Sequence, residues 1–286
     1  MINSDKNSDR QTPVIVIGAP RSGTTFLGDV LATHPELNYL IEPNPMWKRF
    51  TGGDSDYLTA NFSQVAVSKT RESFDRSLLA SGKARLLEKT PQNCLRFPFV
   101  HAVFPEAKFI HIIRNGEEST FSIAKFWETN THGFTGVRIG QRLREMNLRQ
   151  APYYAGQFVK RLLPSGKSPR VFWGPVLPGM KELLEELSIP EVAALQWRTC
   201  VELACHYGRS LPEDQYMELK LESWGPKEMQ QIIDFAGLTD ADCVMNAFMA
   251  EYDPNKTVHR KKAASDASLA AIRPWINSTM QWLEQD

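Results

Sequence analysis

The sequence predicts an α/β fold in which a parallel β-sheet is flanked by helices. Short apolar runs alternate with longer segments of helical spacing along most of the chain, a pattern typical of βαβ units. The first apolar run, VIVI, stops at a glycine and a hydroxyl-rich turn, and a helical pattern follows at once. A length of 286 residues is compatible with one large α/β domain. We therefore expect a disordered tail at residues 1–12 and a single domain at residues 13–286.

Five apolar runs are expected to be the strands of the sheet. They cover residues 14–17, 37–41, 85–88, 108–113 and 216–221, and each ends at a polar or turn residue. Ligands of open parallel sheets collect beyond the carboxyl ends of the strands, so the residues after these runs are the first candidates for a site.

Helical patterns separate the strands. They cover residues 25–33, 117–128, 190–207 and 227–235. Between Thr129 and Pro190, glycines, prolines and aromatic residues interrupt the periodicity. This predicts a helical or irregular insertion at about residues 129–190, of the kind that often covers an active site.

Charge and cysteine content exclude several classes of function. The chain has 33 basic and 33 acidic residues, so no global field favours nucleic acid or an anionic membrane. The four cysteines form no C-x-x-C pair and do not lie among histidines at metal-ligand spacing, which predicts reduced thiols and no metal site. There is no apolar leader segment and no run of 18 apolar residues, so we expect a cytoplasmic protein without a membrane span.

The turn at residues 18–25 has the spacing of the P-loop pattern G-x-x-x-x-G-K-[ST], but Thr24 replaces the lysine. Backbone N–H groups and the helix dipole can surround one phosphate without that lysine. A nucleoside triphosphate would need the lysine and an acidic partner for Mg²⁺, and neither is evident. Arg21 and Thr25 add further donors. A simple turn with capping threonines would need neither Arg21 nor both glycines, so the turn predicts a site for a single phosphate with a small anionic group attached.

Two ordered motifs resemble those of sulfotransferases that use 3′-phosphoadenosine 5′-phosphosulfate (PAPS). The stretch PRSGTTFL, with HP downstream, resembles their 5′-phosphosulfate loop. The stretch FPEAKFIHIIRNGEESTFSIAKFW is similar to their 3′-phosphate motif, in which a strand-ending arginine precedes a serine by eight positions, as Arg114 precedes Ser122. The stretches EKTPQN, VFWGPVLPG and AIRPWI extend the resemblance over most of the chain. It implies a P-loop NTPase-like sulfotransferase fold, PAPS as cosubstrate, 3′-phosphoadenosine 5′-phosphate (PAP) as product, and no metal.

The resemblance also implies a set of nucleotide-binding residues. They are Arg21, Ser22, Gly23, Thr24, Thr25, Arg114 and Ser122, with Arg260 and Lys261 as further candidates for the 3′-phosphate. Two alternatives stay open: Arg114 could pair with a glutamate of the helix that follows, and a short basic run such as HRKK is usually solvated. Relatives often have a tyrosine near the last strand that contacts the nucleotide. Leu221 stands in that place, and Trp224 could supply the contact instead.

Sulfuryl transfer needs a base for the acceptor and a cation for the leaving oxygen. Glu42 follows a strand, twenty-one residues after Arg21, which is similar to the catalytic glutamate of tyrosylprotein sulfotransferases. Lys89 ends another strand in the place where such relatives hold a lysine against the leaving phosphate. We predict Glu42, Lys89 and Arg21 as catalytic residues, with His132 as an alternative base. Glu88 alternates to the other side of its strand and is expected to be structural.

A surface role for Glu42 is the other possibility, with Lys48 or Arg49 as its ion-pair partner.

The predicted activity is transfer of a sulfuryl group from PAPS to a hydroxyl or amine of a small-molecule, sugar or lipid-like acceptor. The expected partners are thus a nucleotide cosubstrate and a hydroxyl-bearing acceptor, and the oligomeric state stays open. Two alternatives remain: a Mg²⁺-dependent kinase with a degenerate P-loop, and a non-catalytic nucleotide-binding scaffold on the same fold.

Overall fold

The structure is a computed structural model that describes residues 12–131, 173–253 and 266–285. The chain divides into two compact units, one of residues 1–124 with 174–286 and a second of Lys125–Trp173. In the second unit the rings of Phe126 and Trp173 lie 4.5 Å apart. The sheet, the core and the site described below belong to the first unit.

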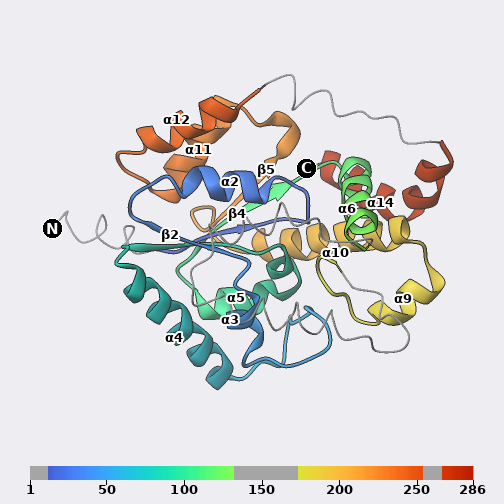
Figure 1. Ribbon diagram of the computed structural model, residues 1–286, viewed down its shortest axis with the longest axis horizontal. Helices are drawn as coiled ribbons and strands as arrows, with labels where there is room; N and C mark the ends of the chain where they lie inside the picture. Colours follow the sequence, from blue (N-terminus) through green and yellow to red (C-terminus); the bar gives the residue numbers. More distant parts are fainter. Residues whose placement is uncertain (1–11, 132–172, 254–265, 286) are drawn as a thin grey trace. The chain divides into compact units, whose positions relative to one another are not determined.

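A sheet of five parallel strands, in the order β2-β3-β1-β4-β5, forms the centre of the first unit (Figure 1). The strands are β1 (Val14–Ile17), β2 (Leu37–Ile41), β3 (Arg85–Lys89), β4 (Lys108–Ile113) and β5 (Tyr216–Lys220). The predicted strands and the α/β fold class are confirmed, and only β3 and β5 end one residue away from the expected position. All four residues of β1 are fully buried, which explains why the sequence of this central strand is continuously apolar.

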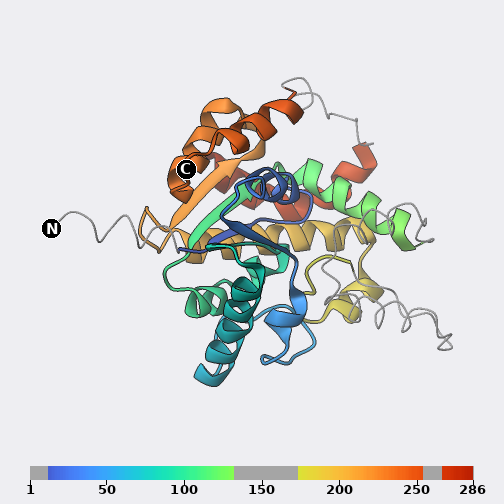
Figure 2. The same cartoon turned by 60° about the vertical axis from the view of Figure 1, so that its left-hand side comes forward.

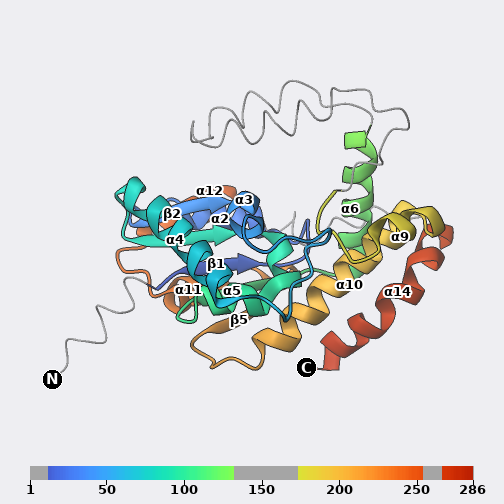
Figure 3. The same cartoon turned by 90° about the horizontal axis from the view of Figure 1, so that it is seen from below.

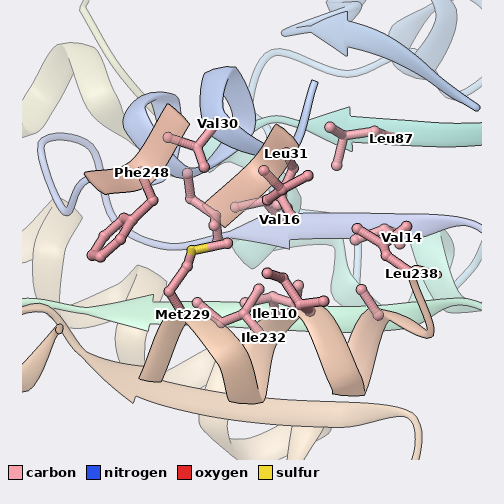
Figure 4. Packing of buried hydrophobic residues seen from close by; sticks show 14 of the residues in the cluster. Val14, Val16, Val30, Leu31, Leu87, Ile110, Met229, Ile232, Leu238 and Phe248 are labelled. Atoms are coloured by element: carbon pink, nitrogen blue, oxygen red, sulfur yellow. The ribbon is translucent and has the colours of Figure 1, made fainter. Parts of the chain in front are cut away.

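One face of the sheet is covered by α2 (Thr24–Leu31), α11 (Pro226–Ala236) and α12 (Asp242–Glu251). Figure 4 shows the core beneath them, where Val16 of β1 and Ile110 of β4 lie close to Met229 and Ile232 of α11. Phe248 of α12 closes this core near α2. Every second side chain of a strand points to this face, so the three helices bury about half of the side chains of each strand that they cover.

The other face carries the 3₁₀ helix η1 (Pro91–Arg96), α5 (Phe97–Val103) and α10 (Ile189–Gly208). Figure 2 shows α11 and α12, in orange, on one side of the sheet and α4 and α5, in teal, on the other. On this second face Phe97 stacks on Phe109 of β4 with ring centroids 4.6 Å apart. The last helix, α14 (Asp266–Gln285), packs along α10 (Figure 3).

The other α-helices among the described residues are α3 (Asn44–Lys48), α4 (Gln64–Ser81), α6 (Gly116–Thr131) and α9 (Met180–Glu186). Local signals define the ends of α4: the Ser63 hydroxyl accepts a hydrogen bond from the N–H of Ala66, and Gly82 adopts φ 68° after the last turn. In the described part of the chain no helix combines the length and the hydrophobicity needed to cross a bilayer.

The strand order reverses between β1 and β4. After β1 the chain proceeds to β2 on one side of the sheet, and after β4 it proceeds to β5 on the other side. The ends of β1 and β4 are adjacent, with Ile17 in register with His111. Open α/β sheets bind ligands at such a reversal of strand order. The turn at residues 18–25 and Arg114 follow these two strand ends.

Candidate active site

The turn at residues 18–25, called the phosphate loop below, depends on two glycines. A Cβ on Gly18 would lie 2.5 Å from the carbonyl oxygen of Ile112, so β4 approaches the loop too closely for any side chain there. Gly23 has φ 94°, and a Cβ on it would lie 2.9 Å from Leu221 Cδ1. Gly18 thus requires glycine because of the close approach of the β4 backbone, and Gly23 because of its left-handed backbone.

The loop leaves hydrogen-bond donors for an anion. The N–H of Leu27 makes the first bond of α2, to the carbonyl oxygen of Gly23 at 3.1 Å, so the N–H groups of Thr24, Thr25 and the next residue lie outside the helical ladder. No side chain caps α2 among the described residues. The Ser22 hydroxyl is buried and has no partner within residues 12–131, 173–253 and 266–285. These donors fit a phosphate or sulfate group at the helix N-terminus.

Arg114 joins the end of β4 to the phosphate loop. Its Nη1 donates to the carbonyl oxygen of Arg21 at 3.1 Å, and its Nη2 donates to Glu118 Oε2 at 2.8 Å. Arg21 Nε in turn donates to Ser122 Oγ at 3.1 Å. The structure therefore brings Arg21, Arg114 and Ser122 into one cluster. It also contains the glutamate pairing that the sequence left open for Arg114.

Two of the predicted residues have a left-handed backbone. Four non-glycine residues in the described chain have a positive φ. Asn61 and Asp240 are residue types that adopt this conformation readily, but Arg21 at 68° and Glu42 at 47° are not. Such conformations persist where surrounding contacts impose them, and they cluster at functional sites.

Glu42 and Lys89 form an ion pair at the carboxyl ends of β2 and β3. Lys89 Nζ lies 2.8 Å from Glu42 Oε1. The side chain of Lys89 is 2% exposed, whereas that of Glu42 is 37% exposed. Lys89 is also in register with Val16 of β1, two residues before the phosphate loop. A buried cation and an accessible carboxylate thus lie beside the predicted anion site, and the surface partners considered for Glu42 are not its partners here.

Glu88 points to the opposite face of β3 and organises the segment after Lys89. Its carboxylate accepts hydrogen bonds from Trp47 Nε1 at 2.9 Å, from the Thr90 hydroxyl and from Asn93 Nδ2 at 2.8 Å. Burial raises the pKa of Glu88 to about 7, although these donors favour the ionised form. The expected structural role of Glu88 is consistent with these contacts.

The stability of the protein should therefore fall with rising pH through the titration of Glu88. Between about pH 4.5, where the unfolded carboxyl ionises, and about pH 7, the folded state retains a proton that the unfolded state has lost. This difference lowers the free energy of unfolding by at most about 3 kcal/mol across the window. In Glu88→Gln this pH-dependent decrease in the free energy of unfolding should be absent. Urea denaturation of both proteins at pH 5 and pH 7.5 measures it.

Other groups also titrate in this range, so the test is the difference between wild type and variant. Burial lowers the pKa of His111 to about 4, and this group contributes in the opposite direction. Equal pH slopes for the two proteins would contradict the role given to Glu88.

The segment after β5 contacts the phosphate loop. Leu221 begins the short 3₁₀ helix η2 (Leu221–Ser223) and lies against Gly23. Trp224 is 6% exposed and packs against Phe26 and Phe248, and its buried indole N–H has no partner in the described residues. Trp224 therefore belongs mainly to the core, and its edge lies near the loop.

The described histidines are not at the carboxyl edge. His34 Nε2 lies 2.8 Å from the carbonyl oxygen of Thr239, and His111 Nδ1 lies 2.7 Å from the Tyr216 hydroxyl. The alternative base His132 and the basic candidates Arg260 and Lys261 lie outside the described residues.

One cluster has the composition of a metal site. Ligand atoms of His111, Cys205 and Glu218 lie within 4.8 Å of one another. However, Arg209 donates twice to the Glu218 carboxylate at 2.8 Å, and the Tyr216 hydroxyl also donates to it at 2.8 Å. Burial raises the pKa of Cys205 and so disfavours the thiolate that metals prefer. This cluster is a hydrogen-bond network between β4, β5 and α10.

Sequence reasoning did not identify Asn44 or the segment after Trp173 as parts of the site. The N–H of Asn44 donates to the carbonyl oxygen of Glu42 at 2.6 Å and closes a tight turn at Pro43, directly after Glu42. Gly174 lies against the phosphate loop, since a Cβ on it would be 3.5 Å from Pro20 Cγ. The VFWGPVLPG stretch was a signal for the segment after Trp173, whereas no local pattern indicated Asn44.

Comparison with known proteins identifies the family. The sequence model of the Sulfotransferase family matches residues 13–166. The chain belongs to the sulfotransferase family. It is 30% identical to nodulation protein NoeE of Sinorhizobium fredii over 39% of this chain and 31% of that protein. It is 26% identical to protein-tyrosine sulfotransferase A of Caenorhabditis elegans over 43% of this chain and 36% of that protein. This sulfotransferase-family chain thus spans about a third of the length of these relatives.

Solved sulfotransferase structures share the fold. A sulfotransferase domain from the curacin biosynthetic pathway superposes with a TM-score of 0.51 at 13% identity, over 85% of this chain and 79% of that one. The sulfotransferase domain of the Synechococcus PCC 7002 olefin synthase gives 0.50 at 16% identity, over 94% of this chain and 96% of that one. At such identities the likeness concerns the fold, which is the P-loop-like sulfotransferase fold that the sequence motifs implied.

Proposed function

We propose that this member of the sulfotransferase family transfers a sulfuryl group from PAPS to a hydroxyl or amine of a small-molecule, sugar or lipid-like acceptor. The observation that carries the proposal is that two clusters of residues lie along the same edge of the sheet. The phosphate loop meets Arg114 and Ser122 on one side, and Lys89 lies 2.8 Å from the accessible carboxylate of Glu42 on the other. Family membership and the named activities of the relatives support it.

The nucleotide would be held at its two phosphate positions. The N–H groups of the phosphate loop, with Thr24 and Thr25, would bind the 5′-phosphosulfate. Arg114 and Ser122 would bind the 3′-phosphate, and the guanidinium of Arg21 would bind the 5′-phosphosulfate beside the transferred group. This arrangement distinguishes a bisphosphate nucleotide from AMP, and it provides no lysine of the P-loop type for a triphosphate.

In the transfer step the acceptor oxygen or nitrogen forms a bond to sulfur, and the bond from sulfur to the phosphate oxygen breaks. The Glu42 carboxylate accepts the acceptor proton. Lys89 Nζ stabilises the negative charge that develops on the leaving phosphate oxygen. The burial of Lys89 strengthens this interaction, because little water competes for its ammonium group.

Calorimetric titration with PAP, AMP and ATP plus Mg²⁺ tests the proposal. PAP should bind more tightly than AMP, and Arg114→Ala should remove this preference at a cost of at least about 1.5 kcal/mol, as expected for a hydrogen bond to a charged group. Arg198→Ala is a matched control, because Arg198 pairs with Glu202 four residues later at 2.8 Å, as Arg114 pairs with Glu118. Tighter binding of ATP with Mg²⁺ would favour the kinase alternative. Unchanged PAP preference in Arg114→Ala would refute the assigned 3′-phosphate contact.

A further inference from the structure

A small polar cavity lies in the segment that follows Glu42. It has a volume of about 160 Å³ and lies between the end of α3, the chain that leads to α4, and η1. Lys48, Gly52, Gly53, Asp56, Tyr57 and Arg96 are among its lining residues. We call it the Lys48–Arg96 pocket. A cavity of this size holds one small polar group rather than a whole acceptor.

The pocket has more hydrogen-bond donors than acceptors. Asp56 Oδ1 lies 2.7 Å from Lys48 Nζ and 3.5 Å from Arg96 Nη2, and Asp56 Oδ2 accepts from the N–H of Val176 at 2.8 Å. The only carboxylate in the lining is therefore fully engaged. Arg96 is 2% exposed, and its buried Nε has no partner in the described part of the chain. A buried donor without a partner is costly unless a bound group accepts from it.

Positive charge also exceeds negative charge around the pocket. Lys48 and Arg96 face the single carboxylate of Asp56. Glu88 also interacts with Arg96, but its pKa is raised to about 7 by burial and its oxygens accept from other residues, so it offsets only part of the charge. Gly52 and Gly53 have φ 67° and 94°, with open space where a Cβ would be. Their backbone is accessible to a group in the pocket.

Hydrogen bonds connect the pocket to both parts of the proposed site. Arg96 Nη2 donates to Asn44 Oδ1 at 3.1 Å, and the N–H of Asn44 donates to the carbonyl oxygen of Glu42 at 2.6 Å. On the other side Asp56 N donates to the carbonyl oxygen of Val176 at 2.8 Å, two residues from the glycine that lies against the phosphate loop. Along α3, Lys48 lies about 6 Å beyond Asn44 at the usual helical rise. The pocket therefore lies close to Glu42 in the fold.

We propose that the Lys48–Arg96 pocket binds an oxyanion of the acceptor, so that the enzyme selects acceptors that already carry a carboxylate, sulfate ester or phosphate ester. Lys48 and the Arg96 guanidinium supply charge-assisted hydrogen bonds to this group. The reacting hydroxyl of the same molecule then lies next to Glu42. This inference rests on the proposed sulfuryl transfer and specifies the class of acceptor.

Matched acceptors test the pocket. With PAPS and the full chain, kcat/KM for 4-hydroxyphenylacetate should exceed that for 4-hydroxyphenylacetamide by about tenfold, the effect of one hydrogen bond to a charged group. A second comparison, of kcat/KM for glucose 6-phosphate and for glucose, shows whether the pocket prefers a phosphate ester to a carboxylate. Lys48→Gln should reduce the preference to near one. The control Lys83→Gln, an exposed lysine that donates to the carbonyl oxygen of Pro35, should retain it.

A binding measurement separates failure of this inference from failure of the proposed function. NMR titration measures the affinity of 4-hydroxyphenylacetate and of its amide for wild type and Lys48→Gln, with and without PAP. It tests binding in the pocket even if no transfer occurs. Tighter binding of the acid, lost in Lys48→Gln, supports the pocket whether or not PAP binds. Equal binding of acid and amide to wild type, or a preference that survives in Lys48→Gln, overturns it. Absence of PAP binding refutes the proposed function alone.

Discussion

Replacement of Glu42 with glutamine is expected to reduce sulfuryl transfer by about 10²–10⁴-fold, the range typical for loss of a general base. The amide keeps the size of the side chain and can still contact Lys89, but it cannot accept the acceptor proton. The affinity for PAP should remain within about twofold, because the phosphate loop and Arg114 are unchanged. Steady-state rates and PAP calorimetry on the same preparation measure both quantities.

Glu202→Gln is a matched control for this experiment. Its side chain is 39% exposed and its carboxylate pairs with Arg198 at 2.8 Å, so its environment resembles that of Glu42. It lies on α10, and the rate of this variant should match the wild type. If Glu42→Gln retained full activity, the base would have to be another residue, and His132 would be the first to test.

Replacement of Lys89 with methionine is expected to lower kcat by about 10²–10³-fold, similar to loss of a single preorganised donor at a developing charge. Methionine fills much of the same buried space without charge. Lys220→Met is the control, since Lys220 also ends a strand but donates to the carbonyl oxygen of Leu283 at 2.8 Å. A merely structural role for Lys89 would lower the melting temperature and leave kcat of the folded fraction unchanged.

The double variant separates the two roles. Since Lys89 and Glu42 are in contact, their effects should not be independent, and the combined loss should be smaller than the product of the single losses. Purely multiplicative losses would show that the two side chains act without coupling.

The strands were predictable because their burial leaves a clear pattern in the sequence. β1 and β4 are covered by helices on both faces, so β1 is an uninterrupted apolar run and β4 is apolar except for Lys108 and His111. In contrast, α4 was not predicted. Only Ala66, Val67, Thr70 and Phe74 are buried along its 18 residues, so its apolar face is too narrow to be distinguished by spacing alone. The strand order depends on contacts between distant segments, which no local pattern specifies.

The candidate site was predictable where it follows strand ends. Arg21, Arg114 and Ser122 lie together, as do Glu42 and Lys89, whereas their catalytic and binding roles stay predictions. The partners of Glu88 could not be predicted in the same way. Trp47 lies 41 positions away in the sequence, and only the tertiary fold brings its indole N–H to Glu88.

The left-handed backbone at Arg21 has a consequence for protein engineering. Glycine and asparagine tolerate this conformation better than arginine does, so such replacements relieve a local cost of about 1–2 kcal/mol. Glu42 differs, because its loss would leave the buried ammonium group of Lys89 without this ion-pair partner. A screen of this protein for heat resistance alone would therefore enrich variants that have lost the Arg21 side chain. Thermostable variants should be selected for turnover at the same time, because the proposed contribution of Arg21 to nucleotide binding would be lost with that side chain.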